Sequence, residues 1–205
     1  MDSTDLLRKA PFSLTQAAID WVKATKAQMT QAEKIGQLFV FHSMGQDPDE
    51  LARLAQLKPA GITRNFSADL SYEAQFIDTL QATAKVPLFV SADLEGSRMS
   101  LPVGTEVPNP LALAAVNDIQ ASRTISRIMA QEARAIGINW SFTPVIDINH
   151  AFRSAIVATR GFGASVDTIE AQALAQIDEF QSAGVAATVK HWPGEGYDNR
   201  DQHLV

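Results

Sequence analysis

Apolar residues recur along this chain with two alternating spacings, which predict a repeat of helices and strands. Spacings of three and four residues indicate amphipathic helices, whereas short runs of consecutive apolar residues indicate strands buried on both faces. The expected helices span residues 47–57, 71–83, 118–135 and 168–183. The expected strands span residues 38–41, 61–64, 86–92, 138–146 and 185–190. Repeated strand–helix units predict an α/β fold with a parallel sheet.

Residues at the ends of these segments support the assignment. Thr30 and Glu33 have the spacing of a capping box, and Asp47 before Pro48 is a second helix start. Three helices are followed by a glycine that we expect to close the helix in the left-handed conformation. These glycines are Gly61, Gly137 and Gly184. Residues 1–28 are predicted to form a helical leader outside the repeat.

The composition argues against several classes of function. The net charge is −6, so no basic surface is available for a nucleic acid partner. The chain has no run of 18 apolar residues and no apolar core of a secretory signal, so we expect no membrane contact and a cytoplasmic location. It has no cysteine, which removes thiolate catalysis and zinc–thiolate sites. We predict neither a metal nor an organic cofactor.

Polar residues gather directly after four of the predicted strands. They are Arg64 and Asn65, Asp93 and Glu95, Asp147 and Asn149, and Lys190 and His191. In both barrel and doubly wound α/β folds, ligands bind at this edge of the sheet. The chain has no complete phosphate-binding glycine motif, and Gly161–Phe162–Gly163 follows no strand. We therefore favour a (β/α)8 TIM-barrel type, with only about five strand–helix units present, because a complete barrel takes about 250 residues.

The segment from Lys190 to His203 holds an unusual density of titratable groups. Asp201 and His203 are two residues apart, so in an extended segment their side chains project to the same side. A carboxylate bonded to one imidazole nitrogen leaves the other nitrogen for proton transfer. The pair also fits a solvated loop, and Lys190 with His191 also fits the rim of a core. A metal site built from His191 and His203 lacks the helical spacing of zinc motifs.

Further candidates follow the earlier strands. Asp93 and Glu95 share one side of an extended segment, as paired carboxylates for acid/base work or hydroxyl recognition do. The alternative is that Glu95 pairs with Arg98 and only orders the loop. Asp147 fits a helix cap or a loop tie. Arg160 lies in a glycine-flanked turn, and its side chain either reaches into a site or lies on the surface.

Four ordered segments together resemble the N-terminal barrel of glycoside hydrolase family 3. They are Glu33–Phe39 (EKIGQLF), Asp93–Arg98 (DLEGSR), Asn139–Asn149 (NWSFTPVIDIN) with Arg160–Gly163 (RGFG), and Lys190–His203 (KHWPGEGYDNRDQH). In the last segment, Lys-His-aromatic-Pro-Gly precedes Asp-x-His, which is similar to the β-N-acetylhexosaminidase branch and not to the β-glucosidase branch. The resemblance implies that residues 29–205 form a partial TIM-barrel catalytic domain.

The resemblance also implies a role for each matching residue. His203 matches the general acid/base, and Asp201 matches its orienting partner. Five residues match positions that hold the hydroxyls of the non-reducing sugar: Asp93, Arg98, Arg160, Lys190 and His191. The implied function is a retaining glycoside hydrolase that removes β-linked N-acetylglucosamine. A β-glucosidase or β-xylosidase and a non-catalytic sugar-binding or interaction module are the alternatives.

The chain departs from the family pattern at two places that change the expectation. Glu195 stands where the branch often has histidine, and a carboxylate there is a competing proton donor. No residue matches the family's nucleophile, an aspartate on a later strand, so we expect an N-terminal fragment that is inactive alone. An incomplete barrel leaves its first and last strands exposed, which predicts self-association through these edges.

Overall fold

The computed structural model describes residues 3–44, 47–151 and 153–204. Five parallel strands lie in one sheet in their order along the chain. They are β1 (Val40–Ser43), β2 (Gly61–Arg64), β3 (Phe89–Ala92), β4 (Trp140–Ser141) and β5 (Ala186–Ala187). A barrel adds its strands in sequence, whereas a doubly wound sheet reverses its order at a switch point. The predicted fold of the TIM-barrel type, with about five units, is confirmed.

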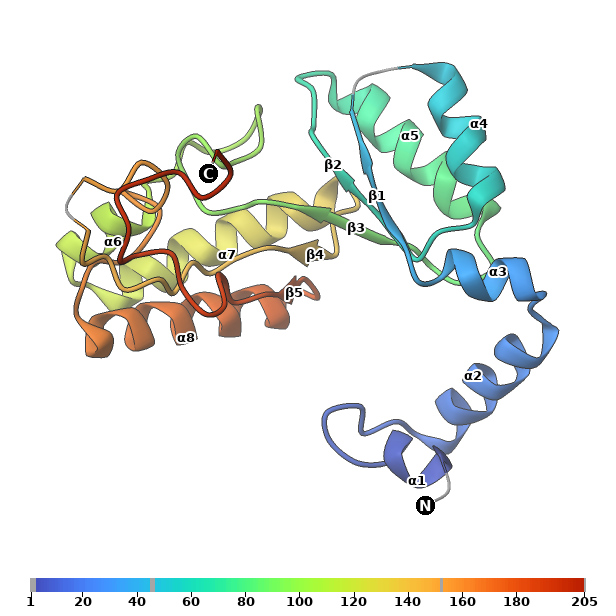
Figure 1. The fold of residues 1–205 in the computed structure, drawn as a ribbon. Coiled ribbons are helices and arrows are strands. Elements are labelled where there is room, and N and C mark those ends of the chain that lie inside the picture. The colour runs from blue at the N-terminus through green and yellow to red at the C-terminus, as the bar shows by residue number, and fades with distance from the viewer. Residues whose placement is uncertain (1–2, 45–46, 152, 205) are drawn as a thin grey trace.

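Helices cover one face of this curved sheet (Figure 1). The described residues contain the helices α1 (Ser3–Leu7), α2 (Gln16–Gln28), α3 (Gln31–Gly36), α4 (Pro48–Leu57), α5 (Leu70–Thr83), α6 (Pro110–Val116), α7 (Ile119–Ala135) and α8 (Val166–Ser182). The core lies between the sheet and the helices that follow its strands. Ile62 of β2 and Val90 of β3 pack there with Phe76 of α5, Ala130 of α7 and Phe180 of α8.

The four helices expected from apolar spacing are confirmed as α4, α5, α7 and α8, with ends within two residues. Both halves of the predicted capping box form, since Thr30 and Glu33 each accept the backbone N–H of the other. The seven-residue helix α6 was not expected. It is too short for periodicity, although Asn109 as cap and Pro110 in the first turn are a start signal.

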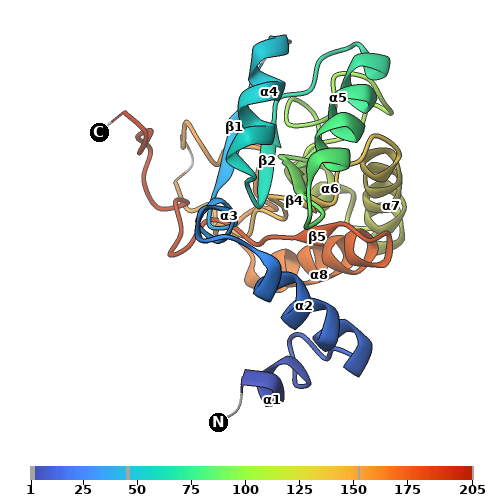
Figure 2. The same ribbon diagram turned by 90° about the vertical axis from the view of Figure 1, so that its right-hand side faces the viewer.

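Within residues 3–28, where a helical leader was predicted, the structure has two helices, α1 and α2. Figures 1 and 2 show both helices projecting from the body that the sheet and its helices form. Among the described residues, every helix is too short or too polar to cross a bilayer.

The strands are shorter than the apolar runs, for local reasons. Leu38 and Phe39 extend the turn that ends α3, because their N–H groups donate to the carbonyls of Ile35 and Gly36. The first strand therefore begins at Val40. The run over 138–146 contains Pro144, which has no N–H, so β4 is only two residues long.

One of the three predicted glycine caps is wrong. Lys58 closes α4 in the left-handed conformation at φ 49°, and Gly61 begins β2 instead. A Cβ on Gly61 would lie 2.4 Å from the carbonyl oxygen of Phe89, so the close approach of β3 requires glycine here. Gly137 and Gly184 have the expected left-handed φ of 91° and 78°.

The face of the sheet away from the helices is the interior side of a barrel. Val40 of β1 and Phe89 of β3 both pair in register with Gly61 of β2, the strand between them, and both are exposed on this face, Phe89 by 50%. Trp140 contacts the ring of Phe89 edge to face, with centroids 5.6 Å apart. The strands at the two edges of the sheet are β1 and β5. Apolar side chains and two strand edges are therefore open to solvent in the described part of the chain.

Candidate active site

The loops after β3, β4 and β5 meet at the carboxyl-terminal end of the sheet. Beyond β4 and β5 the chain continues in parallel, with Val145 paired to Lys190. The N–H of Ile146 donates to the carbonyl of Lys190 at 2.8 Å, and the N–H of Lys190 donates to the carbonyl of Pro144 at 3.1 Å. This register brings Asp147 beside His191.

Glu95 is the centre of an ion cluster, formed by Asp93, Glu95, Arg160 and Lys190. Its side chain is 1% exposed. Arg160 donates from Nε to Oε2 at 2.7 Å and from Nη2 to Oε1 at 2.8 Å. The Nζ of Lys190 lies 2.6 Å from Oε1 of Glu95 and 2.5 Å from Oδ1 of Asp93. Glu95 thus holds Arg160 and Lys190, and Lys190 in turn bonds to Asp93, so that the ion cluster joins three residues predicted for sugar binding.

The contacts in the ion cluster determine the charge of its members. Burial raises the pKa of Glu95, but hydrogen bonds from Arg160 and Lys190 outweigh burial and hold this pKa below its ordinary value. The hydrogen bonds to Glu95 raise the pKa of Arg160. Both groups are therefore charged near neutral pH.

The ion cluster keeps donors for a ligand. An ammonium has three N–H donors, and Lys190 uses two on Asp93 and Glu95. The guanidinium of Arg160 has five, and it uses one at Nε and one at Nη2 on Glu95 and one at Nη1 on the carbonyl of Ile156, at 3.4 Å. Charge-assisted hydrogen bonds from the remaining N–H groups suit the oxygens of sugar hydroxyls.

Asp147 fixes the orientation of His191. Its side chain is fully buried, and Oδ2 lies 2.7 Å from Nδ1 of the His191 ring. Oδ1 accepts the backbone N–H of Glu195 at 2.6 Å. Because a carboxylate only accepts, Nδ1 carries a hydrogen, and in the neutral ring Nε2 is the acceptor left for a ligand. Asp147 is therefore the predicted loop tie, and it also selects the tautomer of His191.

Asp201 and His203 form the predicted side-chain contact. Oδ1 of Asp201 accepts the backbone N–H of His203 at 2.9 Å and lies 2.8 Å from Nδ1 of its ring. These two contacts, the backbone one first, hold the pKa of Asp201 below its ordinary value. The side chain of His203 is 70% exposed. Within the described residues, neither member of the pair bonds to the ion cluster.

Arg98 lies on the tip of a tight turn and not in the ion cluster. The N–H groups of Glu95 and Gly96 both donate to the carbonyl of Met99, and Arg98 is exposed between them. It lines a cleft that Asp93 also lines. The alternative that Glu95 pairs with Arg98 is wrong, because Glu95 bonds to Arg160 and Lys190.

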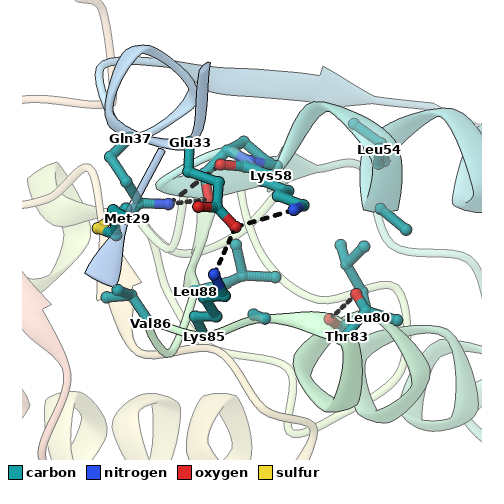
Figure 3. Close-up of a pocket in the computed structure, with 13 residues that line it drawn as sticks. Met29, Glu33, Gln37, Leu54, Lys58, Leu80, Thr83, Lys85, Val86 and Leu88 are labelled. Atoms are coloured by element: carbon teal, nitrogen blue, oxygen red, sulfur yellow. Dashed lines mark hydrogen bonds and ion pairs between the residues drawn. The ribbon is translucent and has the colours of Figure 1, made fainter. Parts of the chain in front are cut away.

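A second pocket lies near the amino-terminal ends of the strands (Figure 3). Lys58 and Lys85 both reach Oε1 of Glu33, at 2.9 and 2.8 Å. Their hydrogen bonds, that of Lys85 first, hold the pKa of Glu33 well below its ordinary value. Residues at this end of a barrel serve stability, whereas active sites lie at the carboxyl end. Among the described residues, no three acidic or histidine side chains are grouped to hold a metal ion.

The sequence matches the Glycosyl hydrolase family 3 N terminal domain over residues 23–205. The chain belongs to glycosyl hydrolase family 3. A relative from Cellulomonas fimi named beta-N-acetylglucosaminidase/beta-glucosidase is 42% identical over 200 residues, which are 97% of this chain and 36% of the relative. Beta-hexosaminidase LpqI of Mycobacterium tuberculosis is 29% identical over 86% of this chain and 46% of its own length. The chain thus spans less than half of these family 3 proteins.

Two solved structures share the fold of this chain. Beta-glucoside phosphorylase BglX bound to 2FGlc superimposes with a TM-score of 0.89 at 29% identity, over 97% of this chain and 36% of its own. A family 3 beta-N-acetylglucosaminidase from Paenibacillus sp. str. FPU-7 gives a TM-score of 0.77 at 33% identity, over 85% of this chain and 35% of its own. Glycosyl hydrolase family 3 therefore accounts for both the sequence and the arrangement of strands.

Proposed function

We propose that the whole protein is a retaining β-N-acetylhexosaminidase that removes β-linked N-acetylglucosamine from non-reducing ends. The ion cluster carries this proposal. It presents fixed, charged hydrogen-bonding groups at the end of the sheet where barrel enzymes bind their substrates. The names of the Cellulomonas fimi and Mycobacterium tuberculosis relatives support the choice of sugar.

In this proposal the ion cluster and His191 hold the hydroxyls of the sugar, and Arg98 contributes from the rim of the cleft. Hydrogen bonds that strengthen as positive charge develops at the anomeric carbon stabilise the transition state more than the ground state. Residues 29–205 are the barrel part of the catalytic domain, and residues 1–28 are a leader to it.

His203 is the proposed general acid/base, and Asp201 its orienting partner. The contact of Asp201 with Nδ1 leaves Nε2 of His203 to protonate the leaving oxygen and then to deprotonate water. The nucleophile of the retaining reaction is proposed to come from another part of the whole protein. The oxygens of Glu95 and Asp147 are occupied by hydrogen bonds, which makes them poor nucleophiles.

Leaving-group dependence tests the role of His203 in the whole protein. His203→Ala should lower kcat/KM for an aryl N-acetylglucosaminide with a poorly acidic phenol by roughly 100- to 10,000-fold. For a strongly acidic phenol, which leaves without a proton, the loss in the glycosylation step should be much smaller. Equal losses with both phenols would show that His203 is not the acid.

A β-glucosidase is the alternative within the family, because the Cellulomonas fimi relative carries both names. The ratio of kcat/KM for aryl N-acetylglucosaminide and aryl glucoside distinguishes the two. A ratio well below one in the whole protein would replace the proposed sugar by glucose.

Phosphorolysis is a second candidate reaction, favoured by the likeness to beta-glucoside phosphorylase BglX. In this reaction a phosphate oxygen, in place of water, attacks the anomeric carbon and gives a sugar 1-phosphate. An imidazole base suits phosphate because, unlike a carboxylate, it does not repel the anion. Turnover with and without inorganic phosphate, with the sugar product identified by mass, separates phosphorolysis from hydrolysis.

A further inference from the structure

Glu195 is an acidic residue beside His191 that has no part in the proposed reaction. Its side chain is 21% exposed. The Oε2 atom is buried, yet it accepts no hydrogen bond from any residue in the described part of the chain. Burying an oxygen with negative charge costs free energy unless a donor satisfies it. A free, buried acceptor in a ligand site is therefore a group that awaits a donor from the ligand.

The position of Glu195 is fixed by its backbone. Its N–H donates to Oδ1 of Asp147 at 2.6 Å. The carbonyl of the next residue, Gly196, accepts the N–H groups of His150 and Ala151 at 3.0 and 2.8 Å. A Cβ on Gly196 would lie 1.9 Å from the carbonyl oxygen of Ile148, so the turn is packed against that segment. Hydrogen bonds on both sides thus hold the residue that carries the free oxygen.

The side chain of Glu195 faces the sugar-binding residues. Oε2 lies 3.9 Å from Nδ1 of His191, beyond hydrogen-bonding distance, and Nδ1 is already bonded to Asp147. The negative charge of Glu195 also acts on Arg160 and contributes to its raised pKa. The free oxygen therefore lies beside His191, and the charge of Glu195 reaches Arg160, both of them residues of the proposed site.

Among the described residues, most other carboxylate oxygens of the site are occupied, and the acceptors that remain beside Glu195 are Oδ2 of Asp93 and Nε2 of His191. Both oxygens of Glu95 and of Asp147 accept hydrogen bonds, and Oδ1 of Asp93 accepts from Lys190. A sugar hydroxyl both donates and accepts, so the N–H groups of Lys190 and Arg160 can serve it. An amide N–H only donates, so cations cannot serve it and it needs an acceptor such as Glu195.

We propose that Glu195 is a specificity-determining residue, whose free carboxylate oxygen accepts a hydrogen bond from the N–H of an acetamido group on the bound sugar. This inference rests on the proposed hexosaminidase function. It gives that function a source of preference for N-acetylglucosamine over glucose, since glucose leaves no amide to satisfy the oxygen. A site built for a donor disfavours the analogue that lacks it, because the buried acceptor then stays unpaired.

The test compares Glu195→Met with the wild-type whole protein on aryl N-acetylglucosaminide and aryl glucoside. Methionine has a similar length and no strong acceptor. The ratio of kcat/KM for the two substrates should fall about 10- to 100-fold, as expected for the loss of a hydrogen bond to a charged group. Glu195→Gln, which keeps one acceptor oxygen, should restore part of the ratio. Glu170→Met, the same exchange at an exposed position on α8, is the matched control and should leave the ratio unchanged.

Three results would overturn the inference. An equal loss on both substrates would assign Glu195 to a shared hydroxyl or to folding, and an unchanged ratio would show that it makes no contact. Loss of all turnover with both substrates, in protein that still binds N-acetylglucosamine by calorimetry, would make it the nucleophile. A wild-type protein without N-acetylglucosaminidase activity would instead refute the proposed function, and with it this inference.

Discussion

Replacing Glu95 by glutamine tests whether the ion cluster positions the sugar-binding cations. Glutamine has nearly the same shape, but it carries no charge and one of its terminal atoms is a donor. Both oxygens of Glu95 accept, from Arg160 at 2.7 and 2.8 Å and from Lys190 at 2.6 Å. The amide nitrogen of the introduced glutamine must therefore face a cationic donor, and that contact becomes repulsive.

The magnitude follows from the contacts that are lost. A hydrogen bond to a charged group contributes about 1.5–3 kcal/mol net, and at least one such bond and the charge behind the others disappear. The side chain of Arg160 is 26% exposed, and Lys190 keeps Asp93, so solvent and the second carboxylate reduce the loss. We expect Glu95→Gln to lose about 3 kcal/mol of transition-state stabilisation, which corresponds to a fall of about 100-fold in kcat/KM if sugar binding needs both cations in place.

The assay is kcat/KM for an aryl N-acetylglucosaminide in the whole protein, together with its pH profile and thermal unfolding. Glu33→Gln is the matched control, because Glu33 is also a buried carboxylate that contacts two cations, at the other end of the strands. That control should lower thermal stability and leave kcat/KM within about threefold of wild type. Glu95→Gln should lower kcat/KM without changing the shape of the pH profile, since Glu95 transfers no proton. A Glu95→Gln protein with wild-type kcat/KM would refute the positioning role.

Three further predictions concern stability and assembly. Because the folded-state pKa of Glu95 is lowered, its charge stabilises the fold above the unfolded pKa of about 4.3, and this contribution is lost as pH falls through the folded pKa. The difference in melting temperature between wild type and Glu95→Gln should therefore shrink only below about pH 4. A difference that vanishes at pH 6 would contradict this. Gly196→Ala, with its Cβ 1.9 Å from a backbone oxygen, should cost about 1–3 kcal/mol by denaturant titration and lower kcat/KM. Gly184→Ala is the control, because its Cβ would meet nothing nearer than Nε of Arg134 at 3.8 Å, and its positive φ of 78° should only lower stability. The isolated 205-residue chain, with β1 and β5 as edges and Phe89 half exposed, should self-associate with rising concentration in light scattering; a monomer at all concentrations would show that these edges do not pair.

Contacts within a few residues of each other were predictable from the sequence. The capping box joins Thr30 to Glu33 within one helical turn, and Asp201 contacts His203 within one tight turn, although an extended segment was expected there. In both cases the local backbone geometry alone determines which side chains meet. The same local reasoning failed at Gly61, because α4 had already closed at Lys58. It also failed for α6, whose seven residues are too few to show a period.

For residues that follow different strands, the sequence predicted only that they lie at the same edge of the sheet. Asp93, Asp147 and Lys190 each follow a strand, and the carboxyl ends of parallel strands lie at one edge of the sheet. Which of these residues meet depends on the register between strands that are far apart in the sequence. The pairing of Val145 with Lys190 is what sets Asp147 against His191, 44 residues away. No spacing within either segment contains that information.

The contacts of Glu95 show why the register between strands matters for function. Within its own segment, Arg98 is the nearest cation, and a loop-ordering pair was the simple expectation. The turn over residues 96–99 instead exposes Arg98 at its tip, while Glu95 stays on the buried side of the chain. There it meets Arg160 and Lys190, which lie 65 and 95 positions further along the chain. A buried carboxylate that bonds to two cations from distant segments has a positioning role that neither its neighbours nor its spacing indicate. The geometry of the proposed sugar site is therefore a property of how the strands align, and a substitution that shifts β3 against β5 should impair sugar binding even where it touches no binding residue.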